Sequence, residues 1–179
     1  MISTHTNVVL VGFMGTGKSA VGRLVATRLR FQFVDNDHIV VERAGKEITE
    51  IFAQQGEAAF RDYETRALES LVHLNRCVVS TGGGAVLKEE NRALLRKIGL
   101  VVLLTAREDV IYDRVARNSK RPLLSTDDPR ATISKILSQR QRAYDEVAQF
   151  SVDTSDLTQE QAAEAVITEA RRAFGWLHH

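Results

Sequence analysis

The chain has 179 residues and a nearly balanced charge, with 24 lysines and arginines against 23 aspartates and glutamates. This length fits a single domain over residues 1–179, enough to bury roughly 70% of the surface of the unfolded chain. The charges are dispersed and no basic tract is interleaved with aromatic residues. The sequence therefore lacks the basic patch that is typical of a nucleic-acid-binding protein. We therefore expect a small-molecule ligand, no nucleic-acid partner, and a monomer as the default state for a chain of this size.

The compartment is indicated by what the sequence lacks. No signal pattern stands at the N-terminus and no apolar run approaches the length of a membrane span. The single cysteine, Cys77, cannot form an internal disulfide and opens an apolar run, which indicates a buried thiol in a reducing compartment. We therefore expect a cytoplasmic protein without a membrane partner, and we assign no function to His178 and His179 at the C-terminus.

Short apolar runs alternate with helical patterns along the chain. The runs cover 8–11, 31–34, 77–80 and 100–104, and a weaker one covers 151–153. This alternation predicts an α/β fold with three layers, in which helices cover both faces of a central parallel sheet of about five strands.

The first apolar run leads directly into a complete phosphate-binding loop, Gly12-Phe13-Met14-Gly15-Thr16-Gly17-Lys18-Ser19. Its glycines let backbone N–H groups converge on phosphate oxygens, and the helix that follows adds partial positive charge. In this motif Lys18 meets the β- and γ-phosphates and the Ser19 hydroxyl ligates Mg²⁺. A chance glycine-rich turn is the alternative, and the strand before and the helix after both disfavour it. The loop therefore predicts binding of a nucleoside triphosphate.

Two acids, Asp35 and Asp37, end the second apolar run. Phosphoryl transfer needs Mg²⁺ to neutralise charge and a carboxylate to orient the attacking group. The spacing of the two acids suggests that one faces the metal and the other the substrate. Capping of the helical segment 37–44 is an alternative role for either residue. No Asn-Lys-x-Asp signature occurs, which disfavours a GTPase.

Three segments stand out from the regular alternation. The crossover between the second and third runs is long and holds a helical pattern over 57–75, so we expect a substrate-binding insertion at about 36–62, over the carboxyl ends of the strands. The stretch at about 116–128 contains one of the two prolines and adjoins the other, and we expect a mobile lid there. The glycines at 82–84 suit a backbone that a ligand approaches closely, although a plain loop is an equal alternative.

Arg140 is the most informative of the arginines. It falls in the middle of the apolar stripe of the helix expected over 130–148, and no acid lies three or four residues away. An uncompensated buried charge costs several kcal/mol. An anionic group must therefore meet Arg140, either a ligand or an acid from another segment.

The other arginines are less distinctive by spacing. Arg61 has Glu57 and Glu64 at helical spacing, which indicates an ordinary pair on a solvated face. Arg114 and Arg121 have no acid three or four residues away. Arg121 also lies in the expected lid, the position of an arginine that closes over a nucleotide.

Taken together, these motifs resemble the shikimate kinase family in their order and spacing. The matching pieces are the loop 12–19, the acids in 33–37, Phe60-Arg61, the segment 80–84, Arg121-Pro122-Leu123-Leu124, and Arg140. The resemblance covers most of the chain and implies a P-loop fold like that of the nucleoside monophosphate kinases. The chain departs from the family at 153–156, where members tend to contact adenine, because it lacks the basic residue that some of them have there.

The resemblance implies a role for each matching residue. It implies catalytic roles for Lys18, Asp37 and Arg121. It implies ATP contacts from Gly12, Gly15, Thr16, Gly17, Lys18, Ser19, Ala20, Arg114 and Arg121. It implies substrate contacts from Asp37, Arg61, Gly82, Gly83, Gly84 and Arg140, with Ser19 and Asp35 on the Mg²⁺ side. This set suits a substrate with a carboxylate and several hydroxyls, since arginines pair with the former and an acid accepts from the latter.

The sequence thus predicts ATP-dependent transfer of the γ-phosphoryl group to the 3-hydroxyl of shikimate, with Mg²⁺, in chorismate and aromatic amino-acid biosynthesis. The hydroxyl is chosen by the resemblance alone. One alternative is a kinase for another small hydroxylated acid such as gluconate. Another is a nucleotide-dependent binding module without turnover, which the intact Lys18, Ser19, Asp35 and Asp37 disfavour.

Overall fold

The computed structural model describes residues 6–117 and 126–176. Within these ranges it contains one five-stranded sheet, all parallel, in the order β2-β3-β1-β4-β5. The strands are β1 (Val8–Val11), β2 (Gln32–Asp35), β3 (Cys77–Ser80), β4 (Leu100–Thr105) and β5 (Phe150–Asp153). The α/β fold and the parallel sheet predicted from the apolar runs are confirmed.

The second strand begins one residue later than its apolar run. The Phe31 amide donates to the Ala26 carbonyl at 2.8 Å, within a helix end where Arg30 adopts a left-handed conformation with φ 57°. Phe31 is therefore part of the helix cap rather than of the strand.

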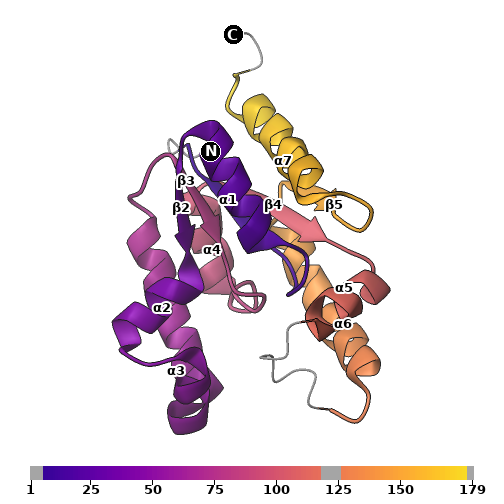
Figure 1. Cartoon of the computed structure of the whole chain (residues 1–179). Helices are drawn as coiled ribbons and strands as arrows, with labels where there is room; N and C mark the ends of the chain where they lie inside the picture. The colour runs from indigo at the N-terminus through magenta and orange to yellow at the C-terminus, as the bar shows by residue number, and fades with distance from the viewer. Residues whose placement is uncertain (1–5, 118–125, 177–179) are drawn as a thin grey trace.

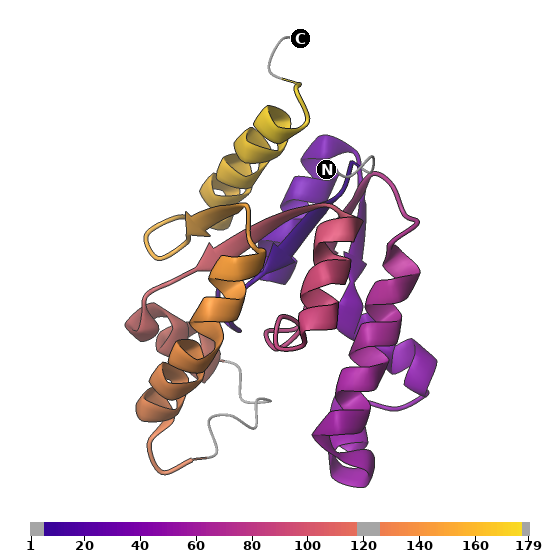
Figure 2. The ribbon, with the colours of Figure 1, turned by 180° about the vertical axis from the view of Figure 1, so that it is seen from behind.

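Helices cover both faces of the sheet, as the three-layer prediction requires. Those in the described ranges are α1 (Lys18–Leu29), α2 (Asn36–Ala44), α3 (Ile48–Leu71), α4 (Glu89–Ile98), α5 (Glu108–Ala116), α6 (Pro129–Val147) and α7 (Gln159–Ala173). Figure 1 shows α1 and α7 in front of the sheet, and Figure 2 shows α3, α4 and α6 in front of the opposite face.

Each face of the sheet has its own apolar core. Val8 and Leu10 of β1 pack with α1 and α7, whereas Val9 and Val11 pack with the helices of the other face. All four side chains are fully buried. This is the alternation that a central strand of a parallel sheet requires, because successive side chains point to opposite faces.

The crossover between β2 and β3 forms a helical unit of its own. Helices α2 and α3 pack against each other through a cluster that includes Val40, Ile51 and Phe60. Helix α3 begins earlier and ends earlier than the helical pattern predicted over 57–75. It is interrupted at Gly56, whose φ of 83° and ψ of 175° are not helical. Figure 1 shows α2 and α3 on one side of the strand ends and α5 and α6 on the other.

The predicted lid falls mostly outside the described residues. Residues 118–125, Arg121 among them, are not part of the described ranges, and α6 begins shortly after them. Among the helices described, none combines the length and the apolarity needed to cross a membrane.

Candidate active site

The phosphate-binding loop connects β1 to α1, and its backbone depends on glycine at three positions. Gly12, Gly15 and Gly17 have φ of 142°, 80° and 96°. A Cβ on Gly12 would also overlap the carbonyl oxygen of Leu104. The loop therefore packs directly on β4, and its conformation is closed to most other residues at these positions.

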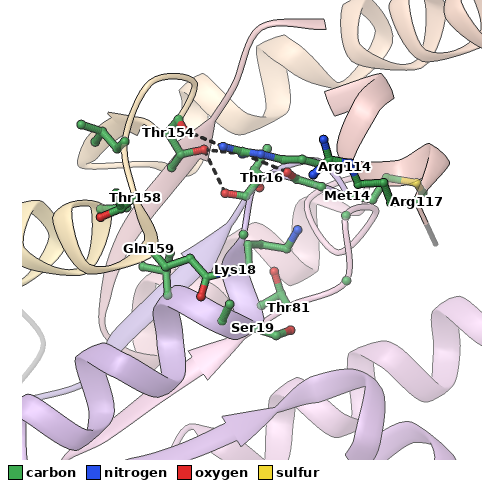
Figure 3. Close-up of a pocket in the computed structure, with 18 of the residues that line it drawn as sticks. Met14, Thr16, Lys18, Ser19, Thr81, Arg114, Arg117, Thr154, Thr158 and Gln159 are labelled. Carbon is green, nitrogen blue, oxygen red and sulfur yellow. Dashed lines mark hydrogen bonds between the residues drawn. The ribbon is translucent and has the colours of Figure 1, made fainter. Parts of the chain in front are cut away.

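Lys18 is the first residue of α1 and lies inside the loop. Its Nζ donates to the carbonyl oxygens of Gly12 and Phe13, both at 2.8 Å, and its side chain is buried. The Thr16 hydroxyl donates to the same Phe13 carbonyl at 2.8 Å. These bonds hold the ammonium group at the centre of the loop, beside the N-terminus of α1 (Figure 3).

A cavity of about 630 Å³, here called the P-loop cavity, opens over this loop. Of the residues predicted at ATP, those that line it are Gly15, Thr16, Gly17, Lys18, Ser19, Ala20 and Arg114. Gly12 lies beneath the loop instead, against β4. The opposite wall comes from the start of α7, with Thr158 and Gln159 labelled in Figure 3.

Arg114 joins three parts of the P-loop cavity. Its guanidinium donates to the Gly15 carbonyl at 3.1 Å, to the Thr154 hydroxyl at 3.0 Å and to the Thr154 carbonyl at 2.7 Å. The Thr154 hydroxyl in turn lies 3.1 Å from the Thr16 carbonyl, to which it donates (Figure 3). Arg114 and Thr154 therefore fix the loop after β5 against the phosphate-binding loop. Sequence reasoning missed Thr154, and also Arg117, which lines the same cavity.

Ser19 lies beside two further oxygen-bearing side chains. Its Oγ is 3.4 Å from Oδ2 of Asp35 and 3.3 Å from Oγ of Ser80. Asp35 and Ser80 are paired in register across β2 and β3. Oδ1 of Asp35 also accepts from the Asp37 amide at 3.0 Å and caps α2. Asp35 therefore caps α2 and also faces Ser19. Asp37 is not the N-cap of that helix.

A second cavity, of about 720 Å³, lies between α3, the loop of Gly82, Gly83 and Gly84 after β3, here called the glycine loop, and α6. We call it the arginine cavity because Arg61 and Arg140 both line it. All the residues predicted at the substrate line it, namely Asp37, Arg61, Gly82, Gly83, Gly84 and Arg140. The two cavities share Met14, Asp37, Gly82 and Gly83. A group bound in one cavity therefore adjoins a group bound in the other.

Arg61 enters the arginine cavity from α3 as part of an ion-pair network. Its guanidinium pairs with Glu64 at 2.9 Å and with Glu57 at 3.2 Å. The pairing predicted from the spacing is present, but the solvated face is wrong, because Arg61 is only 12% exposed and Glu64 is fully buried. Burial raises the pKa of Glu64, and the positive charge of Arg61 opposes that rise.

Arg140 reaches the same cavity from α6. It is half-buried, and its guanidinium carbon lies 5.8 Å from the centre of the Phe13 ring. No acid of residues 6–117 or 126–176 forms an ion pair with it. Glu64 of α3 acts on Arg140 electrostatically but forms no ion pair with it in the described chain. The geometry therefore favours an anionic ligand.

The glycine loop is where the charged groups converge. A Cβ on Gly82 would lie 2.8 Å from Oδ1 of Asp37 and 3.1 Å from Oε1 of Glu64, and one on Gly84 would overlap the guanidinium of Arg61. In the described chain no group accepts a hydrogen bond from the amides of Gly83 and Gly84. The glycines thus permit close approach of two acids and an arginine, and they leave backbone donors at the cavity. Glu64 is a site residue that the sequence analysis treated only as a surface partner.

The family model described as shikimate kinase matches residues 14–171. The chain belongs to the shikimate kinase family. A shikimate kinase from Thermodesulfovibrio yellowstonii is 45% identical over 93% of this chain and 95% of its own length. One from Geobacter metallireducens is 48% identical over 86% of this chain and 85% of its own. The resemblance drawn from the motifs is confirmed, and the family uses ATP.

Solved structures of shikimate kinases have the same fold. The structure of the Acinetobacter baumannii shikimate kinase in complex with shikimate superposes with a TM-score of 0.85, at 33% identity over 99% of this chain and 97% of that one. A gluconokinase from Sinorhizobium meliloti gives a TM-score of 0.61 at 19% identity, over 97% of each chain. That likeness extends to the fold alone, so it does not favour the gluconate alternative.

Proposed function

We propose that this protein transfers the γ-phosphoryl group of ATP to the 3-hydroxyl of shikimate. The observation that carries the proposal is the shared wall of two cavities, one built on a phosphate-binding loop and the other containing two arginines and Asp37. A triphosphate in the P-loop cavity places its terminal phosphate toward that wall. A hydroxylated acid in the arginine cavity meets it from the other side. The product is shikimate 3-phosphate, a step in chorismate and aromatic amino-acid biosynthesis.

The nucleotide is held by the phosphate-binding loop. The amides around Gly15 and Gly17, with the N-terminus of α1, donate to the phosphate oxygens. Lys18 supplies a fixed positive charge next to the β- and γ-phosphates from its position on the Gly12 and Phe13 carbonyls. Arg114 holds the loop and faces the nucleotide in the same cavity.

The acceptor is held by charge and by hydrogen bonds. Arg61 and Arg140 pair with the carboxylate of shikimate, which gives Arg140 an ion-pair partner that no acid of the described chain provides. The oxygen of the 3-hydroxyl bonds to the γ-phosphorus while Asp37 accepts the proton of that hydroxyl. In the same step the bond from the γ-phosphorus to the β–γ bridging oxygen breaks. Asp37 lines both cavities, so it lies where the two substrates meet.

The donor set beside Ser19 fits Mg²⁺. Ser19, Asp35 and Ser80 present oxygen atoms, which this ion prefers, and they adjoin the P-loop cavity at Ser19. Mg²⁺ binds through one or two protein groups plus phosphates and waters. Such binding agrees with the lack, in the described residues, of a cluster of three or more acidic, histidine or cysteine ligands. Ser19 and Asp35 would hold the ion, directly or through water, and the bound ion neutralises phosphate charge.

The remaining parts of the proposal rest on the sequence. Arg121 lies outside the described residues and is proposed to close over the nucleotide from the lid at about 116–128. We further propose that residues 1–179 act as one domain and as a monomer in the cytoplasm, without nucleic-acid or membrane partners.

A coupled assay of ADP release tests the proposal. Purified protein with MgATP is compared on shikimate, gluconate and nucleoside monophosphates, and the product with shikimate is identified by NMR as the 3-phosphate. We expect turnover with shikimate alone. Equal or faster turnover with gluconate would support the alternative kinase, and nucleotide binding without turnover on any acceptor would support the binding module.

A further inference from the structure

Tyr144 is a buried tyrosine that the proposed chemistry does not use. It lies on α6, one turn after Arg140, and it is 2% exposed. Its ring packs in the core between α6 and the sheet, with Val11 and Leu103 in the same cluster. A phenylalanine would fill this position equally well, so packing does not account for the hydroxyl.

The Tyr144 hydroxyl bonds to the glycine loop, and Arg140 interacts with it from one turn earlier on α6. The hydroxyl donates to the carbonyl oxygen of Gly83 at 2.5 Å. Burial raises the pKa of Tyr144 to about 12, so the hydroxyl keeps its proton at any ordinary assay pH. Tyr144 lines neither the P-loop cavity nor the arginine cavity. It therefore holds Gly83 from behind the site.

The carbonyl of Gly83 and the amide of Gly84 belong to one peptide group. Cis peptide bonds are absent from the described chain, so this group is trans and planar, and its N–H is antiparallel to its C=O. Fixing the carbonyl on Tyr144 turns the Gly84 N–H away from Tyr144. Gly84 lines the arginine cavity, and none of the described groups accepts its amide hydrogen.

We propose that Tyr144 is a positioning residue that orients the Gly83–Gly84 peptide, so that the Gly84 amide is a fixed hydrogen-bond donor to the acceptor substrate. The inference rests on the proposed function, because the ligand of that donor is the hydroxylated acid. Glycines make the orientation necessary, since an unrestrained glycine loop samples many backbone conformations and would pay for ordering when the ligand binds.

The same helix thus provides two elements of the acceptor site. Arg140 and Tyr144 are four residues apart and lie on one face of α6. A Cβ on Gly83 would lie 3.3 Å from Nη1 of Arg140, so the guanidinium and the tyrosine hydroxyl both approach this glycine. The position of the backbone donor is therefore set relative to the cation that meets the same substrate.

The test compares Tyr144→Phe with Tyr112→Phe. Tyr112 is a half-buried tyrosine on α5 whose ring stacks on Arg130 at 4.1 Å and whose hydroxyl bonds to no described residue, so its variant is the matched control. We expect Tyr144→Phe to raise the KM for shikimate about 3- to 10-fold, the effect of one hydrogen bond. The KM for MgATP should stay within about twofold, because Gly84 does not line the P-loop cavity. Tyr112→Phe should change neither.

A second measurement begins with the wild-type protein, so its first result does not depend on the folding of the variant. In wild-type protein labelled with ¹⁵N, saturating shikimate should move the Gly84 amide proton downfield, and the shift should be smaller in Tyr144→Phe. An unmoved Gly84 amide in an active enzyme, an unchanged KM for shikimate, or an equal rise in both KM values would each overturn the inference. A wild-type protein that does not phosphorylate shikimate would instead refute the proposed function.

Discussion

Replacing Arg61 or Arg140 should weaken substrate binding in both cases but lower the stability of the fold only for Arg61. Both line the arginine cavity, but Arg61 pairs with the fully buried Glu64, whereas Arg140 pairs with no acid in the described chain. Methionine keeps an unbranched apolar side chain at either position and removes the charge. Each variant should raise the KM for shikimate about 10- to 150-fold, the effect of losing a charge-assisted hydrogen bond of about 1.5–3 kcal/mol.

The stability effects should differ between the two variants. Removing one partner of a buried pair costs about 3–5 kcal/mol. We expect about 3 kcal/mol for Arg61→Met, because Arg61 is itself 12% exposed and its second acid partner, Glu57, is exposed. For a chain of this length that loss corresponds to a fall in Tm of about 6–12 °C. Arg140→Met removes a half-buried cation that forms no ion pair with an acid of the described chain, so its Tm should stay within about 3 °C of wild type or rise.

The pH dependence gives an independent check on Arg61→Met. Burial already raises the pKa of Glu64, and losing Arg61 raises it further. A carboxyl with a raised pKa in the folded state holds its proton after the unfolded chain has released it, so stability falls as the pH rises above the ordinary glutamate value. The destabilisation by Arg61→Met should therefore be larger at pH 8 than at pH 5, and Glu64→Gln should reverse part of it.

Steady-state kinetics and thermal unfolding at both pH values measure these effects. The reasoning would be refuted if the two arginine variants lost equal stability, or if Arg140→Met left the KM for shikimate within threefold of wild type. A destabilisation of Arg61→Met that is independent of pH would show that Glu64 is not the group left unpaired.

Three further predictions concern the phosphoryl-transfer chemistry. Lys18→Ala should abolish turnover while the far-UV circular dichroism stays native, because the side chain contacts loop carbonyls rather than the apolar core; wild-type turnover would remove Lys18 from the mechanism. Asp37→Asn should remove catalysis but keep MgATP binding, whereas Asp35→Asn should raise the Mg²⁺ requirement, and Mg²⁺ titrations that gave the reverse pattern would exchange the two assignments. Arg121→Ala should lower kcat about 10³-fold or more if it stabilises transition-state charge, and a loss below about threefold would exclude that role.

The features that the sequence predicted well are those whose cause is local. The phosphate-binding loop is contiguous, and its glycines are required by its own backbone angles. Arg140 could be found because a cation interrupts the apolar stripe of one helix. The central strands β1, β3 and β4 could be found because both faces of the sheet are covered there, which makes these strands nearly continuous apolar runs.

The features that the sequence analysis missed depend on contacts between segments. Glu64 was taken as a surface partner of Arg61, and its burial arises only where α3 packs beside the glycine loop. A signal was nevertheless present, since Glu64 falls in phase with the apolar Phe60, Ala67 and Leu71 on one face of α3. Thr154 gave no such signal, because its role comes from bonds to Thr16, Thr105 and Arg114, residues 40 or more positions away in the chain.

The wall that the two cavities share also determines how a single ligand could fill both. Met14, Asp37, Gly82 and Gly83 border about 630 Å³ on one side and about 720 Å³ on the other. A compound could join a phosphate chain, bound in the P-loop cavity, to a cyclic carboxylate, bound in the arginine cavity. Its short tether would lie at the shared wall, where the phosphoryl group passes during the proposed transfer. Its second half would then bind at an effective concentration in the millimolar range, without a second loss of translational freedom. The adjacency that brings two substrates together thus makes the site open to inhibition by one molecule that imitates both.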